Sequence, residues 1–342
     1  MGLGSLMIYY VCVEKYVHTL ASVLVHFRTD LRSRLRVIPY SRLELLERVR
    51  TGVVIWTDMD RIAPSTRREA AAIHARLACR GIKLLNHPEG SLRRFQLLDA
   101  LAATGDNPFR VFRPSALPPD LRFPVFLRRE AGAMVTAPAL IPDRISLEHA
   151  LRESVGRHLS ADDWMVAEYS AEPEADGYFR KYGAYRIGDT LFAQHCFISR
   201  SWFVKHLSDG MNELHRLEHR EYVRRNPHAD WIRQKFELAG ITYGRIDYGR
   251  IAGRLQVFEI NTNPTVLTGP QTRFDPDLRP YADSWAETLI ALDPSFSPDA
   301  ASDAAIDRMQ QRILLRLHAV NLRARLRRHL GVARARWRHR LR

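Results

Sequence analysis

The chain has 342 residues, 46% of them hydrophobic and 26% charged, a composition typical of a soluble protein with two or three packed subdomains. No apolar run reaches the roughly 20 residues needed to cross a membrane, and the start lacks the basic segment of a signal peptide, so we expect a cytoplasmic protein. The net charge is +14, but twelve Arg against one Asp lie after residue 305, which argues against a nucleic-acid-binding surface over the whole body.

Residues 7 to about 90 alternate between strand-like and helical segments. Four short runs, IYYVCV, LRVIPY, GVVIWTD and IKLLNHP, have the length and β-branched content of strands. Between them, Ser41–Glu44 and Thr66–Glu69 have the spacing of a helix capping box. Strands that alternate with helices indicate a parallel sheet, so we predict a small α/β domain over residues 1–90.

Residues 91–300 show a different order of elements. A helix is predicted over 92–104, ended by Gly105, and a proline-rich connection then leads to the strand FPVFLRR. Three further strand-like runs follow, WMVAEYS, GYFRKYGAYRIG and TLFAQHCFIS. The segment 204–240 is helical in pattern with a break at Asn226-Pro227, and the two strands after it form a hairpin that turns at Ala252-Gly253.

The hairpin carries the most informative residues of the chain. Glu259 and Asn261 are two residues apart in FEINTNP, so their side chains project from one face of a strand. Asp247 lies twelve residues before Glu259 on the partner strand, where pairing would bring it alongside. Carboxylate and amide oxygens suit Mg²⁺, while exposed acids on a surface strand are the alternative interpretation. We predict a metal site at Asp247, Glu259 and Asn261.

An Asp followed twelve residues later by E-I-N-T-N-P resembles the C-terminal motif of the ATP-grasp superfamily, as in D-alanine–D-alanine ligase and the glutamate-ligase-like members. The resemblance implies a two-lobed α+β fold behind the α/β domain, with ATP and Mg²⁺ (or Mn²⁺) as cofactors. It further implies that Asp247, Glu259 and Asn261 hold the metal ions that bridge the phosphates. Arg245 matches the arginine that faces the transferred acyl group, where it would stabilise an oxyanion.

Other parts of residues 85–270 match the same pattern in the same order. FPVFLRR resembles the strand that carries a phosphate-contacting lysine, but here the position is Arg128 (or Arg129). WMVAEYS resembles the hinge between the two lobes, near residues 165–170. The resemblance implies that Glu168 helps to hold the nucleotide, and the alternative is a buried glutamate paired with Arg or Lys.

The strand GYFRKYGAYRIG is similar to the one that supplies cations to phosphate or substrate, which makes Arg180, Lys181 and Arg186 candidates for nucleotide binding. Alternation places Arg180 and Arg186 on one face and Lys181 on the other, so the three cannot all enter one site. His195 and Arg200 are weaker candidates, and for His195 a structural role is the commoner one.

The last 42 residues, 301–342, form a third segment. Leu315, Leu322, Leu326 and Leu330 recur at helical spacing with arginines beside them, which predicts a basic amphipathic helix. We expect the first half of this helix to pack its leucine face on the body, and the alternatives are contact with an acidic partner, an anionic membrane or nucleic acid.

The combined prediction is an ATP-grasp ligase that joins a carboxylate-bearing small molecule or peptide to an amine-type acceptor through an acylphosphate, forming a C–N or C–S bond. Its domains are the α/β domain at 1–90, an ATP-grasp domain at 91–300 with a helical insertion at 204–240, and the basic tail. Two alternatives stay open: a catalytically weak nucleotide-binding regulatory protein, and a membrane or nucleic-acid binder acting through the tail. The sequence does not determine the substrates, and it allows a homo-oligomer.

Overall fold

The computed structural model describes residues 7–132, 137–155, 163–205, 211–267, 277, 279–292 and 303–319, and the chain divides into two compact units. The first unit is built from Met1–Thr57, Glu69–Leu85 and Asn263–Arg342, and the second from Asp58–Arg68 and Asn86–Thr262. Across the ranges described, no helix is long and apolar enough to span a membrane.

The first unit contains a four-stranded parallel sheet. Its strands are β1 (Ile8–Cys12), β2 (Leu35–Pro39), β3 (Val53–Trp56) and β4 (Lys83–Leu85), in the order β2-β1-β3-β4. These are the four apolar runs of the sequence, and β1 and β3 are buried throughout, as expected for a sheet covered on both faces. The predicted parallel α/β layer is confirmed.

Helices of α, 3₁₀ and π type accompany this sheet. They are η1 (Glu14–Leu20), η2 (Val23–Phe27), α1 (Leu31–Arg34), η3 (Tyr40–Arg48), α2 (Pro64–Cys79) and α7 (Arg279–Ala291). Both predicted capping boxes are wrong. The first segment winds as a 3₁₀ helix that begins at Tyr40 without a side-chain cap, and α2 already begins at Pro64, two residues before Thr66. Proline suits a first helical position because its missing N–H has no partner there.

The helix over residues 304–319 packs on the first unit. Its buried side chains are Ile306, Gln310, Ile313 and Leu317, whereas Leu315 is 70% exposed. The Gln310 amide lies along strand β2, where it accepts a hydrogen bond from the Val37 N–H and donates one to the Leu35 carbonyl, both 3.0 Å long. The prediction that Leu315 belongs to the packed face is therefore wrong, because the buried stripe follows Ile306 and Ile313. The tail leucines from Leu322 onward lie outside the described residues.

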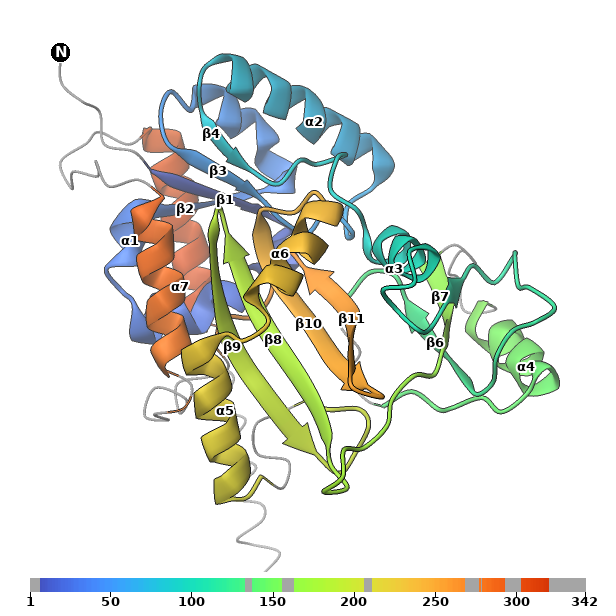
Figure 1. The fold of residues 1–342 in the computed structure, drawn as a ribbon. Coiled ribbons are helices and arrows are strands. Elements are labelled where there is room, and N and C mark those ends of the chain that lie inside the picture. Colours follow the sequence, from blue (N-terminus) through green and yellow to red (C-terminus); the bar gives the residue numbers. More distant parts are fainter. Residues whose placement is uncertain are drawn as a thin grey trace, which may run out of the picture. The chain divides into compact units, whose positions relative to one another are not determined.

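The second unit contains two antiparallel sheets (Figure 1). The smaller has the order β5-β7-β6, from β5 (Val111–Phe112), β6 (Val125–Arg129) and β7 (Trp164–Glu168). The larger has the order β11-β10-β8-β9, from β8 (Phe179–Ile187), β9 (Thr190–Ser199), β10 (Tyr243–Ile251) and β11 (Arg254–Asn261).

Four helices complete this unit: α3 (Arg94–Ala103), α4 (Arg144–Val155), α5 (Glu213–Arg225) and α6 (Ala229–Leu238). The helix predicted before Gly105 and the break at Asn226 are confirmed, since Asn226 takes a left-handed conformation (φ 44°) that ends α5. Side chains of α3, α5 and α6 pack with one face of the larger sheet in a single apolar core. The other face of that sheet carries the polar residues described next.

Candidate active site

The β10–β11 hairpin places two carboxylates opposite each other. Its turn residues, Ala252 and Gly253, both have positive φ (46° and 77°), as two-residue hairpin turns of the favoured type require. The resulting register pairs Asp247 with Glu259 and Arg245 with Asn261. Residues directly opposite in an antiparallel pair project from the same face, where like charges repel. The predicted juxtaposition of the two acids is therefore present, and it needs cations to offset it.

Two arginines bind Glu259. Its Oε2 accepts hydrogen bonds from Arg94 Nη2 at 2.7 Å and from Arg128 Nη2 at 2.9 Å. Burial acts to raise the pKa of Glu259, but the two guanidinium groups overcome it and hold that pKa well below its usual range. Burial and the neighbouring Arg94 lower the pKa of Arg128 to about 10, so it stays charged at neutral pH.

Two further cations surround Asp247. Arg245, two residues earlier on β10, binds both carboxylate oxygens, through Nε at 2.7 Å and Nη2 at 3.1 Å. The Lys181 ammonium on β8 lies 3.6 Å from Asp247 Oδ2. We call Arg94, Arg128, Lys181, Arg245, Asp247 and Glu259 the central cluster. With four cations against two carboxylates it has a formal charge of +2, which suits a polyanionic ligand.

Arg180 and Arg186, also predicted to bind nucleotide, are not brought to this cluster. Lys181 shares its face of β8 with Gly183, while Arg180 and Arg186 project from the other face, beside the helices. Arg180 is held by Asp176 and Glu218, and Arg186 Nε donates to the Gly188 carbonyl at 2.9 Å. The alternation rule thus separated Lys181 from the two arginines in the way the structure shows.

Glu168 ends strand β7 and is fully engaged. Its carboxylate accepts hydrogen bonds from the side chains and backbone N–H groups of both Arg110 and Arg122. Burial opposes ionisation, but these bonds lower the pKa of Glu168 to about 2. Of the two interpretations offered by the sequence, the structure shows the buried glutamate paired with arginine. A ribose hydroxyl would have to displace one of these donors.

Sequence reasoning missed Arg94. It is the first residue of α3 and lies 165 positions from Glu259, and it also donates to the backbone carbonyls of Glu130 and Gly132 in the loop after β6. One signal was present, because Arg93 and Arg94 place two cations at a helix N-terminus, where the helix dipole disfavours positive charge. An anion bound there would resolve this conflict.

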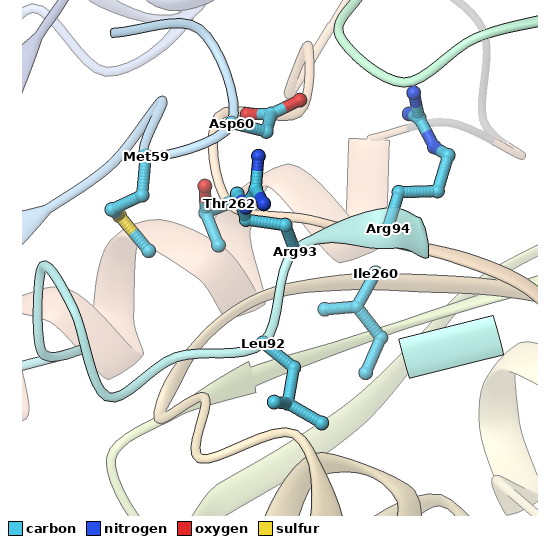
Figure 2. Close-up of a pocket in the computed structure, with 7 residues that line it drawn as sticks. All are labelled: Met59, Asp60, Leu92, Arg93, Arg94, Ile260 and Thr262. Atoms are coloured by element: carbon cyan, nitrogen blue, oxygen red, sulfur yellow. The ribbon is translucent and has the colours of Figure 1, made fainter. Parts of the chain in front are cut away.

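A small pocket of about 20 Å³ adjoins Arg94, with room for little more than a water molecule. Its lining residues, drawn in Figure 2, are Met59, Asp60, Leu92, Arg93, Arg94, Ile260 and Thr262. Ile260 in β11 and Thr262 directly after the strand alternate with Glu259 and Asn261, so the pocket lies behind that strand and not on the face of the cluster. The Arg94 guanidinium points out of it in Figure 2.

The donor groups of the cluster fit a divalent cation. Asp247 and Glu259 are opposed, and Asn261 follows Glu259 by two residues, so the backbone directs its amide to the same face. Hard oxygen donors of this kind match Mg²⁺, which keeps part of its water shell. In the described part of the chain no group of three or more His, Cys, Asp or Glu is close enough to hold a metal, so the third protein donor would be the amide.

No family model matches the chain, and no curated protein is similar to it in sequence. Solved structures are similar. The D-alanine–D-alanine ligase from Coxiella burnetii matches with a TM-score of 0.51 and 13% identity over 92% of this chain and 99% of that one. The D-alanine–D-alanine ligase from Bacillus anthracis complexed with ATP has a TM-score of 0.48 and 13% identity, over 91% of this chain and 99% of that one. The L-amino acid ligase from Bacillus licheniformis has a TM-score of 0.44 and 13% identity, over 76% of this chain and 68% of that one. With its parallel sheet, two antiparallel sheets and full-length likeness to the Coxiella enzyme, the chain has the ATP-grasp fold.

Proposed function

We propose that the protein is an ATP- and Mg²⁺-dependent ligase that activates a carboxylate as an acylphosphate and joins it to an amine. The observation that carries this proposal is the central cluster, in which Asp247 and Glu259 lie opposite each other among four cations. The fold likeness to a D-alanine–D-alanine ligase supports the same reaction class.

Charge explains why the cluster suits a nucleoside triphosphate. Arg94, Arg128 and Lys181 can each turn from a carboxylate to a phosphate oxygen, and the two arginines can contact phosphates with two N–H groups each. Release of Glu259 from its two arginines and of Asp247 from Lys181 would make Asp247 and Glu259, with Asn261, available as ligands for Mg²⁺, while Arg245 keeps its bonds to Asp247. When bound there, the metal would neutralise phosphate charge and orient the γ-phosphate.

Three of the four cations then have roles that follow from their positions. Arg94 and Arg128 come from α3 and β6 and would hold the phosphates, so that the γ-phosphorus faces the substrate carboxylate. Arg245 is anchored by Asp247 and would stabilise the negative charge that develops on the acyl oxygen when the amine attacks. ADP leaves when the substrate carboxylate bonds the γ-phosphorus, and phosphate leaves when the amide C–N bond forms and the amine loses a proton to solvent.

Aromatic side chains offer a site for the base. Phe126 lies two residues before Arg128 on β6, so both project from one face of that strand. Trp202 packs on Phe126 and on Tyr169, with ring centroids 5.5 and 5.2 Å apart, and all three are partly exposed. A purine could stack against them beside the phosphate-binding arginines.

Titration calorimetry with Mg²⁺ and a non-hydrolysable ATP analogue tests the proposal. We expect micromolar binding, and Glu259→Gln should weaken it by about 10- to 100-fold because a charged metal ligand is lost. Glu218→Gln is the matched control, since Glu218 also pairs with an arginine but on the other face of the sheet. No binding, or equal effects of the two variants, would refute the site.

A second candidate is a nucleotide-binding protein with little catalysis. It is favoured by one observation, that a single oxygen of Glu259 is shared by Arg94 and Arg128, so that a metal must displace strong donors. Phosphate release measured over a panel of carboxylates and amines separates the two. Release that depends on an added acceptor supports the ligase, whereas ATP binding without such release supports the binding protein.

A further inference from the structure

Strand β9 contains an irregularity next to the central cluster. Gly183 on β8 pairs with His195, but the next residue, Ala184, pairs with Ala193, so Gln194 is an extra residue on β9. Ala193 and Cys196 both belong to the apolar core on the helix side of the sheet. Regular alternation cannot place residues three apart on one face, so the bulge turns both Gln194 and His195 toward the opposite face, which carries Asp247.

The hydrogen bonds of this pair have only one consistent assignment. Arg245 Nη1 donates to Gln194 Oε1 at 3.2 Å, and because a guanidinium can only donate, the atom that faces it must be the amide oxygen. His195 Nδ1 lies 3.2 Å from the same oxygen, so Nδ1 must carry a proton and donate as well. In a neutral ring Nε2 is then unprotonated, and it has no hydrogen-bond partner among the described residues.

The His195 ring is packed between its neighbours. It stacks on Phe197 with ring centroids 3.8 Å apart, and it lies so close to Gly183 that a Cβ there would be 2.3 Å from His195 Cε1. Burial, together with the positive charges of Arg245, Lys181 and His219, holds the pKa of His195 well below its usual range. The ring therefore stays neutral and keeps one orientation.

We propose that Gln194 and His195, brought to the site face by the bulge in β9, position Arg245 from behind. His195 fixes the Gln194 amide, Gln194 holds Nη1 of Arg245, and Asp247 holds its Nε and Nη2, so the guanidinium is restrained at both ends. Gln194 and His195 are positioning residues that do not touch substrate. The effect of these two residues on the reaction rate rests on the proposed function, whereas the restraint of the Arg245 side chain does not.

The decisive variant is Gln194→Met, which keeps the shape of the side chain and removes the acceptor. Gln194→Glu retains an acceptor oxygen and serves as the conservative rescue. Gln256→Met is the matched control, because Gln256 is an equally buried glutamine in the same sheet that bonds Ser170 instead. We expect Gln194→Met to lower kcat for acceptor-dependent phosphate release by about 10- to 100-fold with KM for ATP changed less than about threefold, and the other two variants to stay near the parent.

A second readout needs no turnover. In protein labelled with ¹⁵N-arginine, the restrained Arg245 should give separate NMR signals for its two Nη atoms, which are assigned by their loss in Arg245→Lys. Gln194→Met should merge these signals, because the guanidinium then rotates faster.

The outcomes separate this proposal from the proposed function. If the parent shows no acceptor-dependent phosphate release, the proposed ligase function fails, and the arginine signals still test the roles of Gln194 and His195. Unchanged Arg245 signals in Gln194→Met, or equal losses of activity in Gln194→Met and Gln256→Met, would overturn the proposal. If Gln194→Met does not fold, His195→Asn serves as the second variant, because its amide retains a hydrogen-bond donor near the position of Nδ1. His195→Asn should preserve the separate Nη signals of Arg245. Loss of those signals would contradict the proposed roles of Gln194 and His195.

Discussion

At the scale of single residues, the cluster shows which contacts a sequence can reveal. Asp247 and Glu259 follow from strand alternation and one short hairpin, because these rules act over a few residues, whereas alternation only separated Lys181 from Arg180 and Arg186. Arg94 does not, since nothing local to α3 indicates that its side chain reaches a strand 165 positions later. A structural role for His195 stays a prediction from its residue type, and the bulge that turns it to the site face has no marker in TLFAQHCFIS.

Glu168 gives a residue-scale prediction for acid stability. Its pKa is lowered to about 2 in the folded state, so the unfolded chain binds a proton more readily. The stabilisation is complete above the ordinary glutamate pKa of about 4.3 and is lost as the pH falls toward 2. Glu168→Gln should lower the unfolding free energy at pH 7 by about 2 kcal/mol and flatten its decline between pH 4.3 and 2, as measured by urea unfolding. A parallel decline in parent and variant would contradict the role of Arg110 and Arg122.

At the scale of elements, the sequence predicted strands better than helix ends. Apolar runs located all four parallel strands, and Gly105 and Asn226 located two helix ends, because left-handed caps select these residues. The capping boxes failed because Pro64 and Tyr40 already begin their helices upstream of the expected hydroxyls. Spacing alone does not reveal whether a serine or threonine precedes a helix or lies inside it.

The hairpin turn gives an element-scale prediction. Ala252 has a φ of 46°, a left-handed conformation that costs a residue with a Cβ roughly 1 kcal/mol and that Asn tolerates better. Ala252→Asn should raise the unfolding free energy by about 0.5–1 kcal/mol, seen as a higher urea midpoint at unchanged slope. Gly253→Ala should act in the opposite direction, since Gly253 also has positive φ with no atom near its missing Cβ. If both variants left the midpoint unchanged, the turn would not be strained.

At the scale of the whole molecule, charge separates the body from the tail. Twelve of the arginines lie after residue 305, while the candidate site is built within the second unit. We therefore expect deletion of residues 320–342 to leave Mg·ATP affinity within about twofold and to abolish any association with anionic vesicles, since each basic residue near such a surface contributes roughly 1 kcal/mol. Calorimetry measures the Mg·ATP affinity, and co-sedimentation measures the association with vesicles. Weaker nucleotide binding after the deletion would show that the tail belongs to the site.

The side chain of Gln310 protects an edge of the parallel sheet from pairing with another copy of this chain. Strand β2 is the first of its sheet, so its outward N–H and C=O groups would otherwise be a template for another strand. By pairing with Val37 and Leu35, the amide imitates the backbone of a neighbouring strand and terminates the ladder. The helix that carries it thus guards against edge-to-edge aggregation, and a chain shortened before residue 303 would present that edge to its neighbours.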